Sequence, residues 1–323
     1  MLPPVSSTAA AALAASPPKP LDGKGVSLPK SAVDTSLDGG WITRMATAGI
    51  AEVKPNSGGG SVSMRVKFLD GKKAALKPEQ TGHPTDPRAE IAAYHVDRLL
   101  GFGRTAAVVG RRFPAADLRA ALVASGADAA YLDRFDKRLV VHDGQIDGAL
   151  IAWHTAALTE EEPEPAYLSF LNSKDAIPEV FAEKLPERSD LVVFDFLIDN
   201  PDRYSGGNVL RLGGKDGPLV FLDQGAAFGK NRLKQKLTTR DRLEKVCRFR
   251  ASTLAVLRAT APTAKKEDRL SAQLAKSLAR DPLAPVLDGA QLAGIDERAS
   301  ILGVHIAACT ARLQRATTLS ASR

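Results

Sequence analysis

The chain has 323 residues, of which 44% are hydrophobic and 25% are charged, a balance typical of globular proteins. Its length suffices for one large domain or two lobes, and no apolar run reaches the roughly 20 residues needed to span a bilayer. The formal net charge of +7 allows nucleic acid, anionic surfaces or phosphate-bearing ligands as partners. Aromatic residues make up only 5%, too few for the stacking platforms of single-strand binders, so no specific nucleic acid is expected.

Residues 1–40 are rich in Ala, Pro, Ser and Gly and show no hydrophobic periodicity, which predicts a disordered leader or linker. The stretch AAAALAA within it is short and has no basic residues before it, so it matches a signal peptide poorly. Ordered structure is expected to begin near Trp41.

Residues 50–80 show the alternation of β-strands. Every second residue from Val62 to Phe68 is apolar, and Asp70-Gly71 is a strong hairpin signal. A two-residue loop there places Lys77 opposite Met64, on the apolar side of the sheet. A lysine on that side needs an anionic partner or ligand, unless it reaches solvent at the end of the sheet.

The segment RAEIAAYHVDRLL (88–100) follows a proline-containing stretch and predicts a helix with an apolar stripe. Glu90 falls in its first turn, where a carboxylate favours the helix dipole. Capping alone would explain Glu90. It is also the candidate anion for Lys77, because a strand lysine paired with a helix glutamate is a recurring phosphate-binding arrangement in kinases.

The next hundred residues are less informative. TAAVVGRRF and GALIAWHTA have the composition of strands or a hinge, and TEEEPEPAY that of an exposed acidic loop. The pattern of DLVVFDFLID (190–199) alone does not distinguish a helix from a strand, but Ser189 and Asp190 are helix-starting residues, which favours a buried helix.

That helix leads into LIDNPDRYSGGNVLRL, and NVLRL and PLVFLD flank a Gly-rich turn, which predicts a hairpin. A symmetric turn places Asn208 opposite Asp223. An amide oxygen beside a carboxylate is a ligand set for Mg²⁺ or Mn²⁺, with nucleotide phosphates in the remaining positions. Asp202 then orients an acceptor hydroxyl and takes its proton, and Arg203 holds that carboxylate or neutralises phosphate charge. A plain surface turn uses the same residue types.

Four blocks of sequence carry a likeness to a known family: KKAALKPEQ, AEIAAYHVDRLLGFGRTAAVVGRRF, FLIDNPDRYSGGN with FLDQGAAFGK, and VCRFRASTLAVLR. In this order, across roughly residues 45–315, they resemble the Four-jointed and Golgi-casein-kinase family of secretory-pathway kinases, of which the chain looks like a bacterial or divergent member. The family has an atypical kinase fold that is distantly related to phosphoinositide kinases.

The resemblance implies a two-lobed α+β fold, with a small β-rich N-lobe over residues 41–150 and a mainly helical C-lobe over 151–323. It makes Lys77 the nucleotide-phosphate lysine, Glu90 its partner and a possible metal contact, Asp202 the catalytic base and Asp223 the metal-binding aspartate. The glycine-rich loop is then SGGGS, with Gly58, Gly59 and Gly60.

The chain departs from the family in its catalytic loop. Golgi kinases have His after Asp-Arg and a carboxylate downstream, whereas this chain has Tyr204, and its next ligand candidate is Asn208. The Four-jointed and phosphoinositide branches place Asn about one residue earlier. Either the loop is wider here or Asn208 does not bind metal.

The function implied is a kinase that uses ATP with Mn²⁺ or Mg²⁺ and phosphorylates a hydroxyl. Protein Ser/Thr is the first choice of acceptor, a glycan or small molecule is the alternative, and the altered loop leaves a nucleotide-binding pseudokinase open. The basic stretch around residues 230–250 is either a solvated helix face or a docking site for an acidic substrate.

The two cysteines, Cys247 and Cys309, are too few for a disulfide-dense scaffold or a four-cysteine zinc site. The resemblance implies that they pair; two reduced, buried cysteines of a cytosolic protein are the alternative. Localisation stays open: the resemblance favours a secreted or periplasmic protein, and the lack of a clear signal peptide allows a cytoplasmic one.

Overall fold

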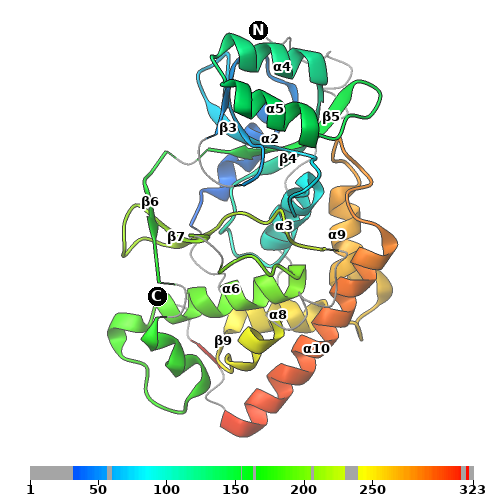
Figure 1. The fold of residues 1–323 in the computed structure, drawn as a ribbon. Coiled ribbons are helices and arrows are strands. Elements are labelled where there is room, and N and C mark those ends of the chain that lie inside the picture. Colours follow the sequence, from blue (N-terminus) through cyan, green and yellow to red (C-terminus); the bar gives the residue numbers. More distant parts are fainter. Residues whose placement is uncertain are drawn as a thin grey trace.

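The structure is a computed structural model that describes residues 32–56, 60–153, 155–162, 165–204, 207–229, 239–313 and 318–319. An antiparallel sheet with its covering helices forms one end of the molecule, and helices dominate the other end (Figure 1). The predicted α+β architecture, with a β-rich N-terminal part and a mainly helical C-terminal part, is confirmed.

The N-terminal part is built on a five-stranded sheet of order β1-β2-β3-β5-β4, in which every neighbouring pair is antiparallel. The predicted strands all form. The elements of this part are η1 (Thr35–Leu37), α2 (Asp38–Thr47), β1 (Ile50–Pro55), β2 (Met64–Phe68), β3 (Lys73–Pro78), α3 (Pro87–Leu99), β4 (Val108–Pro114), α4 (Ala115–Ala124), α5 (Ala129–Arg138) and β5 (Gln145–Ala152).

Two predicted boundaries need correction. The predicted leader 1–40 ends too late in the chain, because α2 already begins at Asp38. The buried carboxylate of Asp38 pairs with Arg98 at 2.6 Å. Residues 1–31 lie outside the described part of the chain. The lobe boundary at residue 150 falls inside β5, which continues to Ala152 because it pairs with β3 along its length.

The β2–β3 hairpin corrects the predicted register by one residue. Phe68 N donates to Lys72 O at 2.9 Å, and Met64 pairs with Leu76. The loop therefore has three residues and ends on Gly71, whose φ of +82° suits glycine. A slip of one residue exchanges the two faces of a strand. Lys77 thus points away from the apolar face, to the side that it shares with Ala75.

Helix α3 crosses between the sheet and the helical part (Figure 1). The side chain of Asp86 accepts a hydrogen bond from Arg88 N at 2.8 Å, and Pro87 occupies the first turn, so the helix begins where sequence patterns predict. The predicted apolar stripe is buried, as is Glu90. Burial extends beyond the stripe because α3 packs against β4, β5, α6 and α9.

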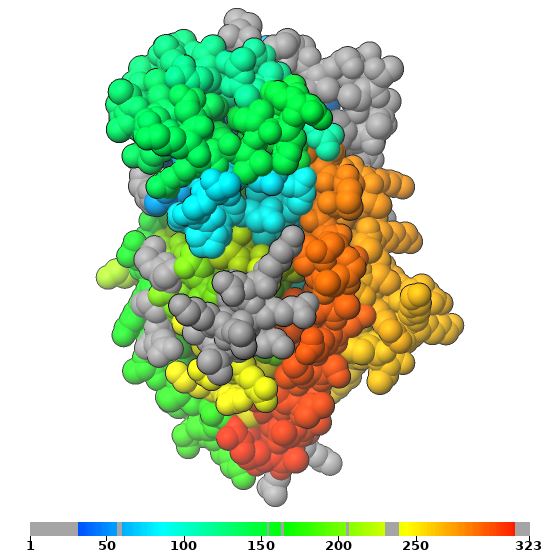
Figure 2. All heavy atoms as spheres, turned by 45° about the vertical axis from the view of Figure 1, so that its right-hand side comes forward, coloured from blue at the N-terminus to red at the C-terminus, as the bar shows by residue number. Residues whose placement is uncertain are grey.

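The C-terminal part combines a three-stranded sheet, β6-β7-β8, with a set of helices. Figure 2 shows the chain from about residue 280 onward running along one side of the molecule, from the N-terminal part to the opposite end. The elements are β6 (Leu158–Glu160), η2 (Ala166–Asn172), η3 (Glu179–Phe181), α6 (Lys184–Ile198), β7 (Val209–Leu212), β8 (Leu219–Phe221), β9 (Phe249–Arg250), α8 (Ala251–Ala259), η4 (Lys266–Asp268), α9 (Leu270–Leu278), α10 (Gly289–Leu313) and β10 (Thr318–Leu319).

The predicted buried helix is confirmed as α6, although it begins at Lys184 and not near Ser189. The acidic segment TEEEPEPAY, which precedes this helix in the chain, is only partly a loop. Thr159 and Glu160 belong to β6, an edge strand of the second sheet. Glu161 is half-buried and pairs with Arg188 at 2.8 Å and Arg211 at 3.0 Å. The exposed-loop prediction was wrong here because these ion pairs offset the cost of withdrawing the carboxylate from water.

The hairpin of β7 and β8 also differs from the predicted register by one residue. Val209 pairs with Phe221, so Asn208 falls opposite Leu222 and not opposite Asp223. The turn is asymmetric, with Gly213 and Gly214 both at positive φ. The predicted cross-strand pair is therefore absent.

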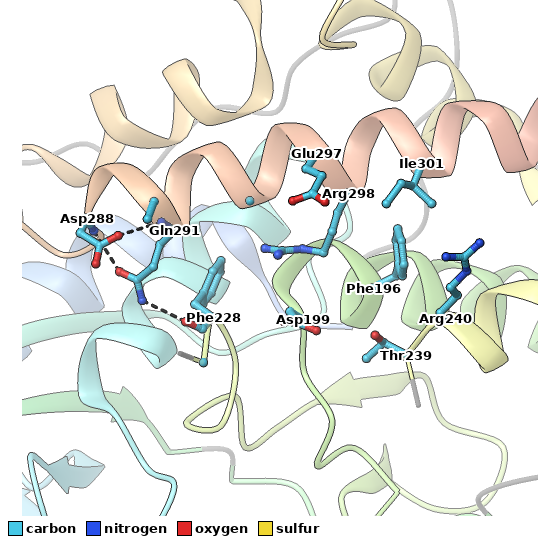
Figure 3. A pocket seen from close by; sticks show the side chains of 13 residues that line it. Phe196, Asp199, Phe228, Thr239, Arg240, Asp288, Gln291, Glu297, Arg298 and Ile301 are labelled. Atoms are coloured by element: carbon cyan, nitrogen blue, oxygen red, sulfur yellow. Dashed lines mark hydrogen bonds between the residues drawn. The ribbon is translucent and has the colours of Figure 1, made fainter. Parts of the chain in front are cut away.

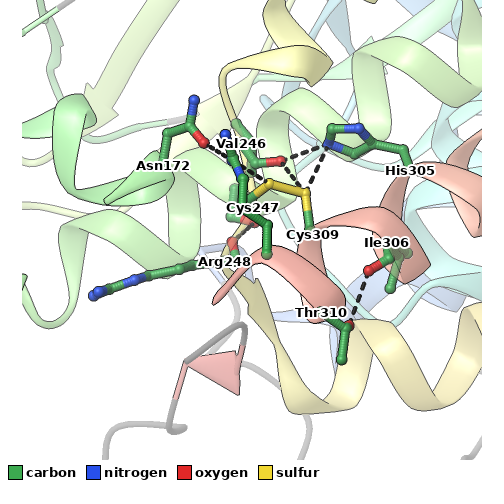
Figure 4. The surroundings of a disulfide bond; sticks show 10 residues. Asn172, Val246, Cys247, Arg248, His305, Ile306, Cys309 and Thr310 are labelled. Atoms are coloured by element: carbon green, nitrogen blue, oxygen red, sulfur yellow. Dashed lines mark hydrogen bonds between the residues drawn. A yellow bond between two sulfur atoms is a disulfide. The ribbon is translucent and has the colours of Figure 1, made fainter. Parts of the chain in front are cut away.

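The predicted pairing of Cys247 with Cys309 is confirmed: a disulfide joins the segment before β9 to α10, with the two Cα atoms 5.1 Å apart (Figure 4). His305 lies beside it and donates from Nε2 to Val246 O at 2.7 Å. Because both sulfurs are used in the disulfide, this Cys–His–Cys group does not offer thiolates to a metal. Within the described helices, none is long and apolar enough to cross a membrane.

Candidate active site

A cavity of about 450 Å³ opens between the N-terminal sheet and the β6–β7–β8 sheet. One end is apolar and the other is charged. The apolar residues come from both sheets: Ala75, Val108, Ile151, Ala152, Leu158, Leu210 and Phe221. The polar residues are Lys77, Glu90, Thr105, Asn208, Asp223 and Gln224. Such a cavity suits a ligand with a flat apolar group at one end and an anionic group at the other.

Lys77 holds the charged end together. Its Nζ lies 2.6 Å from Glu90 Oε1 and 2.7 Å from Asp223 Oδ1. The side chain of Glu90 is 4% exposed, whereas that of Asp223 is 44% exposed and accessible to a ligand. The predicted need of Lys77 for an anionic partner is therefore met twice, by carboxylates from α3 and from the segment after β8.

These contacts shift the ionisation of the cluster. Burial by itself lowers the pKa of Lys77, but the charges of Glu90 and Asp223 outweigh burial and raise the pKa above the usual lysine value. Burial by itself raises the pKa of Asp223, but the Lys77 ammonium outweighs it and holds the pKa below the usual range. Lys77 and Asp223 are therefore an ammonium and an ionised carboxylate paired with each other.

The backbone after β8 is arranged to present Asp223. This residue has a φ of +57°, and the following Gln224 N donates to Glu90 Oε1 at 3.0 Å. Asp86 N also donates to Gly225 O at 2.9 Å. An added Cβ at Gly225 would lie 3.1 Å from the side chain of Thr85. The start of α3 and the Asp-Gln-Gly segment are thus fixed against each other.

Asp202 lies on the loop that follows α6 and is half-buried. The loop is closed by two side chains: Asp202 N donates to Asn200 Oδ1 at 3.1 Å, and Asn208 Nδ2 donates to Asp202 O at 3.0 Å. Since the amide nitrogen of Asn208 is used in this way, Oδ1 is the atom that it can offer to a cation. Asn208 lines the cavity together with Asp223.

Arg203 has a different environment from the predicted one. It is fully buried, and its guanidinium pairs with Asp195 at 3.0 Å and donates to Leu222 O and to Gln224 Oε1. Neither holding the Asp202 carboxylate nor neutralising phosphate charge fits this burial. Its bonds instead tie the Asp202 loop to α6 and to the segment that carries Asp223.

Of the predicted glycine-rich loop, Gly58 and Gly59 lie outside the described residues. Gly60 is described, and its carbonyl accepts a hydrogen bond from Arg138 at 2.7 Å. Sequence reasoning missed Asp195, Gln224 and Thr85. The one sequence signal for Asp195 is its position within the apolar stretch of the predicted buried helix, because a carboxylate that is buried there requires a partner.

A second cavity, of about 500 Å³, lies between α6 and α10 (Figure 3). On its rim, Gln291 N donates to Asp288 Oδ1, and Gln291 Nε2 donates to Phe228 O. Arg298 Nε donates to Leu197 O at 2.8 Å. No residue predicted from the sequence to act in the site lines this cavity.

Comparison with known proteins connects this geometry to a family. The human extracellular serine/threonine protein kinase FAM20C is 27% identical over 313 residues, covering 81% of this chain and 52% of that protein. The human pseudokinase FAM20A is 27% identical over 298 residues, covering 76% of this chain and 53% of that protein. The human glycosaminoglycan xylosylkinase is 26% identical over 326 residues, covering 88% of this chain and 78% of that protein. The chain thus spans about half the length of the first two relatives.

Two solved structures share the fold. The Golgi casein kinase with Mn/ADP bound superimposes with a TM-score of 0.70 at 20% identity, over 90% of this chain and 80% of that one. Hydra Fam20 with sugar superimposes with a TM-score of 0.66 at 22% identity, over 85% of this chain and 90% of that one.

A family model described as "Golgi casein kinase, C-terminal, Fam20" matches residues 154–318, more than half of the chain. This range contains the Asp202 loop, Asn208, Asp223 and both cysteines, so the match covers the C-terminal side of the cavity. The chain belongs to the Fam20 family of Golgi-casein-kinase-like proteins.

Proposed function

We propose that this chain is a metal-dependent kinase that transfers the γ-phosphoryl group of ATP to a hydroxyl, with Ser/Thr of a protein as the acceptor. The observation that carries the proposal is the convergence of Lys77, Glu90 and Asp223 at one end of a cavity whose other end is apolar. A kinase needs this combination, because its catalysis rests on positioning and charge stabilisation around a triphosphate.

The apolar end of the cavity fits an adenine ring, which places the phosphates at the Lys77 end. Lys77 binds phosphate oxygens and holds the Glu90 side chain in position. Asp223, Glu90 and Asn208 offer two carboxylates and an amide oxygen, the hard donors that Mg²⁺ and Mn²⁺ prefer. When bound, the ion neutralises charge on the transferring phosphoryl group.

Asp202 receives the acceptor. Its carboxylate accepts a hydrogen bond from the incoming hydroxyl, aligns the oxygen and takes the proton late in the transfer. The bonds of Asn200 and Asn208 to the Asp202 backbone fix the loop, and Arg203 fixes it against the Asp223 segment. The two aspartates therefore have separable tasks.

A sugar hydroxyl is the second candidate acceptor. Two observations favour it: a similar protein is a glycosaminoglycan xylosylkinase, and a protein of the same fold was solved with sugar. Incubation with labelled ATP, casein-like peptides and a panel of glycans distinguishes the acceptors. Labelling of peptides supports our proposal, and labelling of glycans alone replaces it with the second candidate.

A nucleotide-binding pseudokinase is the candidate from another class, since one similar protein is a pseudokinase and the loop after Asp202 is one residue longer than in two related branches. The test compares Asp223→Ala with Asp202→Ala in metal-dependent nucleotide binding and in phosphate transfer. We expect Asp223→Ala to lose binding, and Asp202→Ala to keep binding and lose transfer. Nucleotide binding without turnover, unaffected by Asp202→Ala, would establish the pseudokinase.

A further inference from the structure

His83 lies between the end of the glycine-rich stretch, at Gly60, and the segment that follows Asp223, which its neighbour Thr85 contacts at Gly225. It belongs to the connection between β3 and α3. An added Cβ at Gly60 would lie 3.3 Å from His83 Nε2 and 3.3 Å from Cδ2, so the ring packs against the end of the glycine-rich segment. The ring is half-buried.

The ring is held by its neighbour Thr85. His83 Nδ1 and Thr85 Oγ1 are 2.8 Å apart, and Thr85 N donates to His83 O at 2.8 Å. Thr85 is itself buried against Gly225, and Asp86 N donates to Gly225 O. The imidazole is therefore fixed relative to the segment that carries Asp223.

The other ring nitrogen, Nε2, has no hydrogen-bond partner among the described residues. When the Thr85 hydroxyl donates to Nδ1, the proton of the neutral ring is on Nε2, which makes that atom a donor. This donor lies between Gly60 and the segment that carries Asp223. In kinases the terminal phosphates of the nucleotide lie between a glycine-rich loop and the metal-binding aspartate.

We propose that His83 is a phosphate ligand of this site: its Nε2–H donates a hydrogen bond to an oxygen of the terminal phosphate of the triphosphate. This inference rests on the proposed kinase function. Because ADP lacks that phosphate, His83 favours binding of the triphosphate over the diphosphate. Lys77, in contrast, is fixed by two carboxylates and supports both nucleotides.

The test measures binding of ADP and of the non-hydrolysable analogue AMP-PNP by calorimetry, in the presence of Mn²⁺. His83→Asn keeps a polar atom near Nδ1 and removes the one at Nε2, whereas His83→Gln places an amide donor near Nε2. We expect His83→Asn to weaken AMP-PNP binding roughly tenfold and ADP binding less than twofold, as for loss of one hydrogen bond to a charged group. We expect His83→Gln to retain most of the preference.

Two further variants separate the phosphate contact from a structural role. Thr85→Val removes the hydroxyl that orients the ring and should give a smaller loss of AMP-PNP binding. His142→Gln changes an exposed histidine of the same lobe and should change neither affinity. Thermal unfolding of each variant shows that it is folded.

These measurements separate failure of the His83 proposal from failure of the kinase proposal. Wild-type protein that binds neither nucleotide overturns the kinase proposal and the His83 role together. Wild-type binding with an unchanged AMP-PNP to ADP ratio in His83→Asn overturns the His83 role alone. An equal loss for both nucleotides overturns the assignment to the terminal phosphate.

Discussion

The ammonium of Lys77 lies 2.7 Å from the carboxylate of Asp223, although 146 positions separate the two residues in the chain. The same ammonium pairs with Glu90, so one cation joins the sheet, α3 and the segment after β8. The charged end of the cavity is thus preformed.

Replacing Lys77 should destabilise the protein as well as inactivate it. Lys77→Met leaves the Glu90 carboxylate buried without its cation, which should cost about 3 kcal/mol in free energy of unfolding, measured in urea. The double variant Lys77→Met, Glu90→Gln should recover part of this loss, because no buried charge remains. Lys73→Met, an exposed lysine of the same strand, is the control and should change stability by less than about 0.5 kcal/mol. A Lys77→Met protein as stable as wild type would refute the buried-pair interpretation.

Arg203→Lys should disturb both stability and transfer. Lysine cannot reproduce the planar set of bonds to Asp195, Leu222 and Gln224. We expect a loss of about 3 kcal/mol in urea unfolding and a fall in transfer rate. Arg240→Lys, in an exposed pair with Glu244, should be neutral. Loss of transfer without loss of stability would instead indicate a direct contact of Arg203 with substrate.

The free energy of unfolding should fall in acid, because His95 is buried in its neutral form. Burial lowers its pKa to about 3, with a further contribution from the Arg98 charge, and its Nδ1 lies 2.9 Å from Ser277 Oγ. The unfolded chain binds a proton below about pH 6.5, whereas the folded protein does not until about pH 3. The stability contributed by the neutral ring is therefore complete above pH 6.5 and is lost as pH falls toward 3.

Urea unfolding at pH 7 and pH 4.5 tests this. In His95→Asn the difference in unfolding free energy between the two pH values should shrink by about 2–3 kcal/mol. His142→Gln removes an exposed histidine and should leave the difference unchanged. An unaltered difference in His95→Asn would mean that other groups carry the acid sensitivity.

The disulfide should stabilise the helical part. It closes a loop between residues 62 apart in the chain, and the loss of loop entropy in the unfolded state corresponds to about 4 kcal/mol. The double variant Cys247→Ser, Cys309→Ser should lower the melting temperature, and reductant should lower that of the wild type but not that of the variant. Equal melting temperatures with and without reductant in the wild type would argue against this contribution.

Local sequence determined much of the fold. Asp86 and Pro87 start α3, and alternation of apolar residues predicts β2, because caps and hydrophobic periodicity act within a few residues. The residue types at Lys77, Glu90, Asp202 and Asp223 also predict phosphate and metal chemistry, since an ammonium suits phosphate and carboxylates suit a divalent ion.

Only the tertiary structure decided how these groups meet. Both hairpins differ by one residue from the predicted register, because the backbone conformation of each turn, and not its composition alone, sets the pairing. The partner of Arg203 is Asp195, on a preceding helix, since a buried guanidinium binds whichever carboxylate the packing brings to it. The role proposed for His83 depends on its packing against Gly60 and, through Thr85, against Gly225, neither of which is its neighbour in sequence. Contacts of this kind depend on the path of the whole chain.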